Sequence, residues 1–251
     1  MELVWYHWAG IVLVGVMQGF LNTVAGGGTL LVLPALTFLG MDLAVANGTN
    51  RIAILLQSVS GAASFKQQKA LSFKVALPLA AAATLGALVG TFVVVQVDRK
   101  SLNLVIAALI TLMALLLVFK PKMWEEVKEQ HWPKWGVYLA FFAVGIYGGF
   151  IQAGVGFFLS WALVVAAGMD LVSGNAVKTI IIGCYTTISL AIFYMNGLVN
   201  VPVGLVLAIG SMAGAVLGAR FTVMKGNKWV RYVLAFVVVI SAVKMVMDAI
   251  G

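Results

Sequence analysis

Long stretches without a single charged side chain are the feature that most constrains this chain. They lie between Glu2 and Asp42, between Lys74 and Asp98, between Lys134 and Asp170, and between Lys178 and Arg220. Each stretch is longer than the roughly 20 apolar residues that a helix needs to cross a bilayer. Only 10% of the residues are charged, whereas soluble domains carry about 25%. The chain is therefore predicted to be an all-α, polytopic membrane protein. This excludes a soluble enzyme, a nucleic-acid-binding protein and a disulfide-linked scaffold.

The sequence contains the same pattern twice. Gly40-Met41-Asp42-Leu43 is matched by Gly168-Met169-Asp170-Leu171, and Gly86-Ala87 by Gly214-Ala215, at a constant offset of 128 residues. Such self-similarity indicates two copies of one structural unit. We expect a first membrane repeat over residues 1–119, a polar cytoplasmic linker over 120–134 and a second membrane repeat over 135–251.

Each repeat is predicted to contain a helical hairpin broken by glycines and then three membrane-spanning helices, about 8 to 10 helical segments in all. The expected helices cover residues 8–24, 29–40, 43–67, 72–97 and 101–119 in repeat one, and 136–153, 157–167, 171–196, 201–223 and 229–249 in repeat two. A segment of about a dozen residues reaches only about 18 Å, well short of the roughly 30 Å hydrocarbon core. The short segments are therefore interpreted as the second arms of hairpins that enter from opposite faces, with their glycine tips meeting near the bilayer centre.

The basic residues indicate that the two repeats are inverted. The loop after the long helix of repeat one carries Lys66, Lys69 and Lys74, whereas the matching loop of repeat two, 195–202, has no charge. Because cytoplasmic loops are rich in Lys and Arg, the repeats are predicted to face opposite ways. Both termini are then expected to be extracytoplasmic.

Two basic residues lie inside predicted spans and have no part in topology. Arg51 and Lys178 each fall about one third of the way into a long helix. Charged groups at such depth are costly and indicate function. The nearest acidic residues, Asp42 and Asp170, are interpreted as helix N-caps. Cations without carboxylate partners favour an anion site. The alternative is that both side chains bond backbone carbonyls and hold helices together.

Neutral donors are expected to complete this anion site, together with the helix N-termini that begin at the glycine tips. The predicted substrate-binding residues are Arg51, Lys178, Asn22, Gly26, Gly27, Gly28, Thr29, Asn47, Thr49, Asn50, Gln152, Gly154, Gly156, Asn175 and Thr179. The glycines at 86, 90, 210, 214 and 218 have small-xxx-small spacing, which is typical of close helix packing. One cysteine and two histidines offer no metal cluster and no catalytic dyad. Neither a cofactor nor enzymatic activity is expected, and the predicted partners are the lipid bilayer and a small anion.

These motifs together resemble those of one known family. Gly26-Gly27-Gly28, Thr49-Asn50-Arg51 and Asn175-Ala176-Val177-Lys178 are similar to the paired half-motifs of the TauE/SafE sulfite exporters, also called the toluene sulfonate uptake permease family. The resemblance covers nearly the whole chain and implies a bacterial inner-membrane protein that moves sulfite, sulfonates or other organosulfur anions. Arg51 stands where the family often has lysine, and Lys178 falls one position earlier than strict symmetry with Arg51 requires.

The leading hypothesis is a secondary transporter that exports small sulfur-containing anions by alternating access. A passive anion channel is the first alternative, and a non-transporting membrane scaffold is a weaker one. Because no carboxylate or histidine lies in the interior of a predicted span, Asp248 being at the very end of 229–249, any proton coupling is expected to come from protonation of the substrate itself.

Overall fold

A computed structural model of the chain describes residues 4–96 and 132–250, and for 231 and 234–250 it describes the backbone alone. The described residues form helices and no strands, which confirms the all-α prediction. The helices are α1 (Trp5–Val24), α2 (Thr29–Phe38), α3 (Leu43–Gln67), α4 (Phe73–Gln96), α6 (Lys134–Phe150), α7 (Val155–Trp161), the π-helical turn η2 (Ala162–Ala166), α8 (Leu171–Met195) and α9 (Val201–Ile250). The predicted helix at 101–119 and most of the predicted linker lie outside the described residues.

Four of these helices are long and apolar enough to cross a membrane: α1, α4, α8 and the first part of α9. The equally long α3 is not among them, since its buried polar residues lower its hydropathy. The helix α9 changes direction at Gly226, where φ is 72° and ψ is −175°. This kink separates the two helices predicted for that region. The chain is a multi-pass membrane protein.

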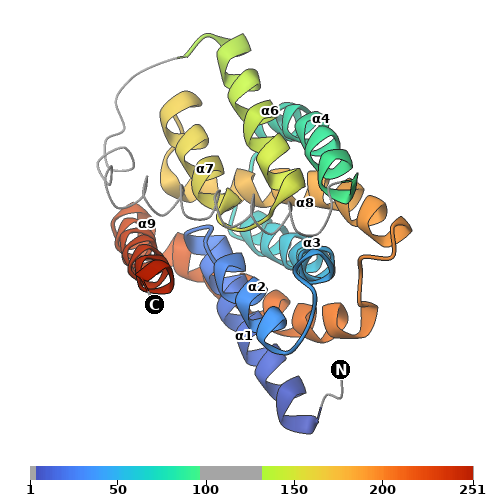
Figure 1. Cartoon of the computed structure of the whole chain (residues 1–251). Coiled ribbons are helices and arrows are strands. Elements are labelled where there is room, and N and C mark those ends of the chain that lie inside the picture. The colour runs from blue at the N-terminus through green and yellow to red at the C-terminus, as the bar shows by residue number, and fades with distance from the viewer. Residues whose placement is uncertain (1–3, 97–131, 251) are drawn as a thin grey trace.

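Two helical hairpins approach each other from opposite ends of the molecule (Figure 1). One consists of α1 and α2, and the other of α6, α7 and η2. Both tips reverse at a glycine in the left-handed region, Gly26 with φ 100° and Gly154 with φ 72°. The backbone of Gly26 touches that of Gly156, so a Cβ on either would overlap the other chain segment. The structure therefore confirms that the two glycine tips meet.

Each hairpin packs against a helix of the other repeat. The first arm α1 runs parallel to α9, where Gly19 faces the carbonyl oxygen of Ser211. In the same way α6 runs parallel to α4, where Gly90 faces the carbonyl oxygen of Ile146. A missing Cβ lets the backbones approach this closely. The close-packing role predicted for the glycines at 86, 90, 210, 214 and 218 is confirmed, because each faces the backbone of a neighbouring helix.

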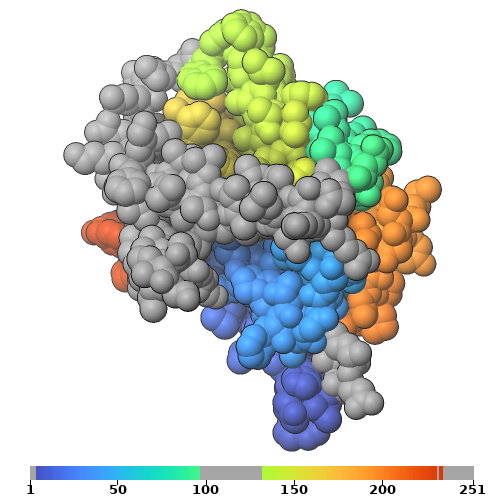
Figure 2. Space-filling model, in the orientation of Figure 1, coloured from blue at the N-terminus to red at the C-terminus, as the bar shows by residue number. Residues whose placement is uncertain are grey.

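The long helices α3 and α8 form the centre of the structure (Figure 1). Gly61 of α3 lies beside Thr179 of α8, and Ser58 lies beside Gly183, so the two helices run antiparallel. They are equivalent helices in the two repeats, and equivalent helices that run antiparallel show that the repeats are inverted. Figure 2 shows α1 and α2 (blue) and α6 (yellow-green) at opposite ends of one face.

Both long helices begin at an aspartate that caps the helix. Asp42 accepts a hydrogen bond from the amide of Ala44, and Asp170 accepts from the amides of Val172 and Ser173. Partial burial acts to raise the pKa of Asp170, but the hydrogen bonds from Ser173 and Val172 outweigh it and hold that pKa below its ordinary value. The N-cap interpretation of both aspartates is confirmed.

Candidate functional site

One turn of α3 carries three fully buried polar side chains on one face, Asn47, Asn50 and Arg51, which we call the α3 polar turn. Residues at positions i, i+3 and i+4 of a helix share a face. This face lies against the tip of the second hairpin, where α6 ends at Phe150.

Arg51 binds the end of α6 with its terminal nitrogens. Nη2 donates to the carbonyl oxygen of Gly149 at 2.7 Å and to that of Gly148 at 3.3 Å. Nη1 donates to the same Gly148 oxygen at 3.3 Å and to Oε1 of Gln152 at 3.1 Å. The last carbonyls of a helix lack partners within the helix and carry partial negative charge. A guanidinium suits this position, and its hydrogen bonds to the described residues all go to carbonyl and amide oxygens.

The Arg51 contacts continue into neighbouring helices. Its guanidinium carbon lies 4.5 Å from the centre of the Phe193 ring, a cation–π contact with α8. Gln152 donates to Oη of Tyr185 at 3.1 Å and to Oγ1 of Thr186 at 3.3 Å. Arg51 and Gln152, both predicted site residues, are thus brought together.

Asn47 and Asn50 connect the same turn to both hairpins. Asn47 donates through Nδ2 to the carbonyl oxygen of Phe150 at 3.1 Å, which completes the cap of α6. Asn50 accepts through Oδ1 from Nε2 of Gln18 on α1, at 2.6 Å. Because a backbone carbonyl can only accept, the Phe150 oxygen fixes which atom of the Asn47 amide is nitrogen.

Three buried atoms of the α3 polar turn have no hydrogen-bond partner among the residues that the structure describes. They are the donors Arg51 Nε and Asn50 Nδ2 and the acceptor Asn47 Oδ1. Buried polar atoms in proteins are nearly always paired. Three unpaired atoms on one turn therefore indicate a place where a partner beyond the described residues, such as a bound ligand, completes the hydrogen bonding.

The equivalent turn of α8, which we call the α8 polar turn, consists of Asn175, Lys178 and Thr179. Asn175 donates through Nδ2 to the carbonyl oxygen of Val24, at the end of α1, at 2.8 Å. Lys178 donates to Oδ1 of Asn175 at 2.6 Å and to Oγ of Ser160 at 3.2 Å. Thr179 donates to the carbonyl oxygen of Asn175 at 2.8 Å. Each of these side-chain polar atoms has a partner within the protein.

Arg51 and Lys178 belong to different places in the structure. Lys178 adjoins Thr179, which lies beside Gly61 on α3. Ten residues separate Arg51 from Gly61, about 15 Å along the helix. Among the described residues, the two cations share no hydrogen-bond partner.

The other predicted site residues bond within the protein. The amide of Thr29 donates to Oδ1 of Asn22 at 3.3 Å, and Nδ2 of Asn22 donates to Oγ1 of Thr29, also at 3.3 Å. Asn22 therefore caps the short helix α2. Thr49 accepts from the amide of Asn200 at 2.8 Å. The predicted glycines form the two tips, and there Gly28 packs against the backbone of Gln18.

Several buried polar residues around these turns were not predicted from the sequence. They are Gln18, Thr91, Ser160, Tyr185, Thr186, Ser189 and Ser211. The available signal was a neutral polar side chain within an apolar helix, which interhelical hydrogen bonding also explains. Among the described residues, no three His, Cys, Asp or Glu side chains could hold a metal ion.

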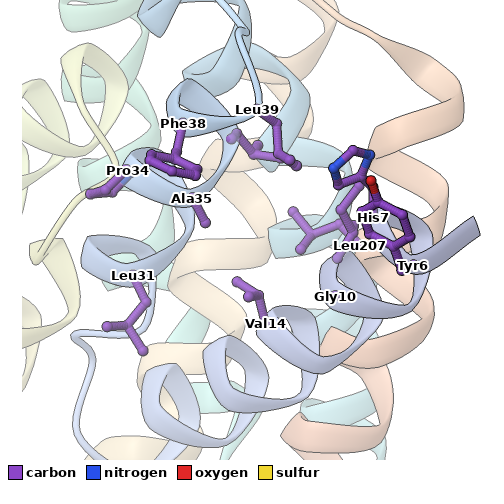
Figure 3. Close-up of a pocket in the computed structure, with 12 residues that line it drawn as sticks. Tyr6, His7, Gly10, Val14, Leu31, Pro34, Ala35, Phe38, Leu39 and Leu207 are labelled. Carbon is purple, nitrogen blue, oxygen red and sulfur yellow. The ribbon is translucent and has the colours of Figure 1, made fainter. Parts of the chain in front are cut away.

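An apolar cavity of about 450 Å³ lies between the two arms of the first hairpin (Figure 3). Gly10 and Val14 of α1 line one side, and Leu31 and Pro34 of α2 line the other. A second cavity, of about 630 Å³, lies at the equivalent place beside η2 and α6. Neither cavity is lined by a residue of the α3 or α8 polar turn.

Comparison with known proteins finds relatives that are described as probable membrane transporters. A "Probable membrane transporter protein" of Haemophilus influenzae is 29% identical over 237 residues, which cover 94% of this chain and 92% of the relative. The "Probable membrane transporter protein YfcA" of Escherichia coli is 29% identical over 241 residues, covering 95% and 89%. The "Probable membrane transporter protein ORF9" of a Sinorhizobium species is 25% identical over 248 residues, covering 98% and 95%. No solved structure matches the chain.

Residues 11–245 match the family described as sulfite exporter TauE/SafE, which confirms the resemblance seen in the motifs. With relatives of matching length, inverted repeats and several apolar helices, this chain belongs to the TauE/SafE family and is a multi-pass membrane transporter.

Proposed function

We propose that the protein is a secondary transporter that exports small sulfur-containing oxyanions, such as sulfite or a sulfonate, by alternating access. The observation that carries this proposal is the α3 polar turn. It presents a buried guanidinium with two unpaired donors, Arg51 Nε and Asn50 Nδ2, at the contact between the two hairpins. Oxygen atoms of an anion are the partners that such donors need.

The charges around this turn favour an anion over a cation. Among the described residues, Arg51 donates only to carbonyl and amide oxygens, which carry no formal charge to balance the guanidinium. A sulfur oxyanion supplies that counter-charge and has several oxygens that can accept at once. Lys178 bonds a different set of residues, on α7 and α8, and provides a second basic position on the proposed route.

Full burial of the polar turns favours a carrier over a channel. Arg51 has an exposed fraction of 0% and Lys178 one of 1%. A channel requires a continuous wet path, whereas a carrier passes through conformations in which its site is closed to both sides. The structure is consistent with such a closed conformation.

The hairpins offer a route to alternating access. The short arm α2 contains Pro34, and the equivalent position in repeat two begins the π-helical turn η2. Both features weaken regular helical hydrogen bonding. Each short arm also borders a cavity. We infer that the two arms shift in turn, opening the centre first to one side and then to the other.

The proposed location is the bacterial inner membrane, with both termini extracytoplasmic. Eleven basic residues lie on the predicted cytoplasmic side and three on the other. The positive-inside rule supports this orientation.

The Asn50→Asp variant in proteoliposomes tests the proposal. The substitution keeps the oxygen that accepts from Gln18 but replaces the unpaired donor with an anionic oxygen. We expect uptake of labelled sulfite and of an alkylsulfonate to fall at least about tenfold. Asn196→Asp, at the exposed end of α8, is the matched control and should transport as the wild type does.

Two outcomes would contradict the proposal. Undiminished uptake by Asn50→Asp would remove the anion site from α3. Single-channel currents without saturation or counterflow would favour the channel over the carrier.

A further inference from the structure

The α3 polar turn contains an unpaired acceptor as well as unpaired donors. Asn47 uses Nδ2 for the carbonyl oxygen of Phe150, so the amide cannot be turned around without losing that bond. Its Oδ1 is buried and has no donor among the described residues. An oxyanion without hydrogen cannot satisfy this atom, because it offers only acceptors.

In the second repeat, the acceptor equivalent to Oδ1 of Asn47 has a hydrogen-bond donor. Asn175 occupies the position equivalent to Asn47 and accepts from Nζ of Lys178 at 2.6 Å. At the offset of 128 residues, Asn50 stands where Lys178 stands. Since Nδ2 of Asn50 and Oδ1 of Asn47 are both unpaired, a group that fits there must accept from one and donate to the other.

Building on the proposed function, we propose that the α3 polar turn selects a monoanion that carries its own hydrogen-bond donor. The anionic oxygens accept from Arg51 Nε and Asn50 Nδ2, and an O–H or N–H of the substrate donates to Asn47 Oδ1. Asn47 is thus the specificity-determining residue. One guanidinium balances one negative charge. For sulfite, the transported form is the hydrogen-bearing monoanion, so a proton moves together with the sulfur.

Hydroxyethanesulfonate and propanesulfonate form a matched pair of probes. Both are permanent monoanions of nearly the same size, and they differ by a hydroxyl group in place of a methyl group. We expect the wild-type protein to bind hydroxyethanesulfonate about tenfold more tightly or better, because a site that hydrogen-bonds a hydroxyl rejects the analogue that lacks it. Calorimetric titration of the purified protein measures the two affinities.

The ratio of the two affinities reports on Asn47 independently of protein yield. In Asn47→Ala the ratio should fall to within about twofold of one. In Asn175→Ala, which alters the equivalent residue of repeat two, the ratio should stay at the wild-type value even if both affinities drop. A wild-type ratio near one, or an unchanged ratio in Asn47→Ala, overturns the inference. Transport of both sulfonates would in that case leave the proposed function intact. Failure of both probes to bind or be transported would overturn the inference, and the proposed function would fall only if sulfite were not transported either.

A second measurement uses only the wild-type protein, so its outcome does not depend on whether Asn47→Ala folds. Wild-type uptake of sulfite at a fixed total concentration should rise as the pH falls through the titration of the dianion. Uptake of hydroxyethanesulfonate should stay constant over the same pH range. Sulfite uptake that follows the dianion concentration overturns the inference.

Discussion

The α3 and α8 polar turns occupy equivalent places in the two repeats but differ in their hydrogen bonding. In both, an asparagine caps the end of the opposite hairpin's first arm, Asn47 on Phe150 and Asn175 on Val24. On α8 the cation Lys178 completes the turn by donating to Asn175. On α3 the cation Arg51 donates instead to the end of α6. Three atoms of this turn, Arg51 Nε, Asn50 Nδ2 and Asn47 Oδ1, have no partner among the described residues.

Under the proposed function, this difference separates a structural role from a binding role. The shared asparagine cap holds each long helix to the tip of the other repeat, and both repeats need it. The polar side-chain atoms of the α8 turn all have hydrogen-bond partners within the protein. In the α3 turn, two donors and one acceptor have no partner among the described residues. An inverted pair of repeats can therefore share one architecture and still have a single principal binding site.

Removing the guanidinium should have the largest effect. In Arg51→Met, we expect affinity for sulfite to fall about 10- to 100-fold, because a charged donor is lost. The carbonyl of Gly148 also loses its side-chain donor, at about 1–3 kcal/mol for a buried group, whereas that of Gly149 keeps the hydroxyl of Thr91. Calorimetry and thermal unfolding in detergent measure the two effects. Binding at wild-type strength would assign Arg51 to helix capping alone.

Filling the contact between the hairpin tips should have the next largest effect. In Gly156→Ala, the added Cβ overlaps the backbone of Gly26. Overpacking of this kind costs about 1–3 kcal/mol, and we expect a lower melting temperature and slower flux. Gly10→Ala is the control, since a Cβ there meets nothing within 4 Å. Equal behaviour of the two variants would show that the tips do not need their close contact.

Removing the lysine of α8 should affect flux more than binding. Lys178→Met keeps the length of the side chain but leaves Oδ1 of Asn175 without its donor. We expect affinity within about twofold of wild type and a several-fold slower flux, because under the proposed function the α8 turn lies outside the anion site, while Asn175, which bonds the end of α1, loses its donor. Loss of affinity as large as that of Arg51→Met would show that the two turns bind the anion jointly.

The smallest effect is expected at the helix N-caps. Asp170→Ala and Asp42→Ala should each destabilise the protein by about 1 kcal/mol. Because the pKa of Asp170 is lowered in the folded protein, its carboxylate stabilises the fold above its unfolded-state pKa, and this stability is lost as the pH falls through the folded-state pKa. Melting temperatures measured across acidic pH should show this loss in the wild type and a flatter profile in Asp170→Asn.

Much of the architecture could be predicted because it depends on local chemistry. The charge-free stretches, the 128-residue offset and the glycine tips led to the helices, and the described boundaries fall within a few residues of the predicted ones. Arg51 and Lys178 stood out because a charge inside an apolar helix is costly.

The partners of those residues could not be predicted from the sequence. Gln18 and Asn50, or Asn175 and Val24, are joined only by the way the hairpins pack against the opposite repeat. Neutral side chains such as Tyr185 and Thr186 give no signal that separates a network member from an ordinary packing residue.

The sequence by itself determined that this is an inverted-repeat membrane protein with two buried cations, since hydropathy and charge act residue by residue. Only the tertiary structure decided that the two cations have separate hydrogen-bond partners. It also showed that α8 satisfies its own polar turn and that α3 does not. Hydrogen-bond satisfaction depends on distances between atoms far apart in the chain, and those distances exist only once the helices are packed.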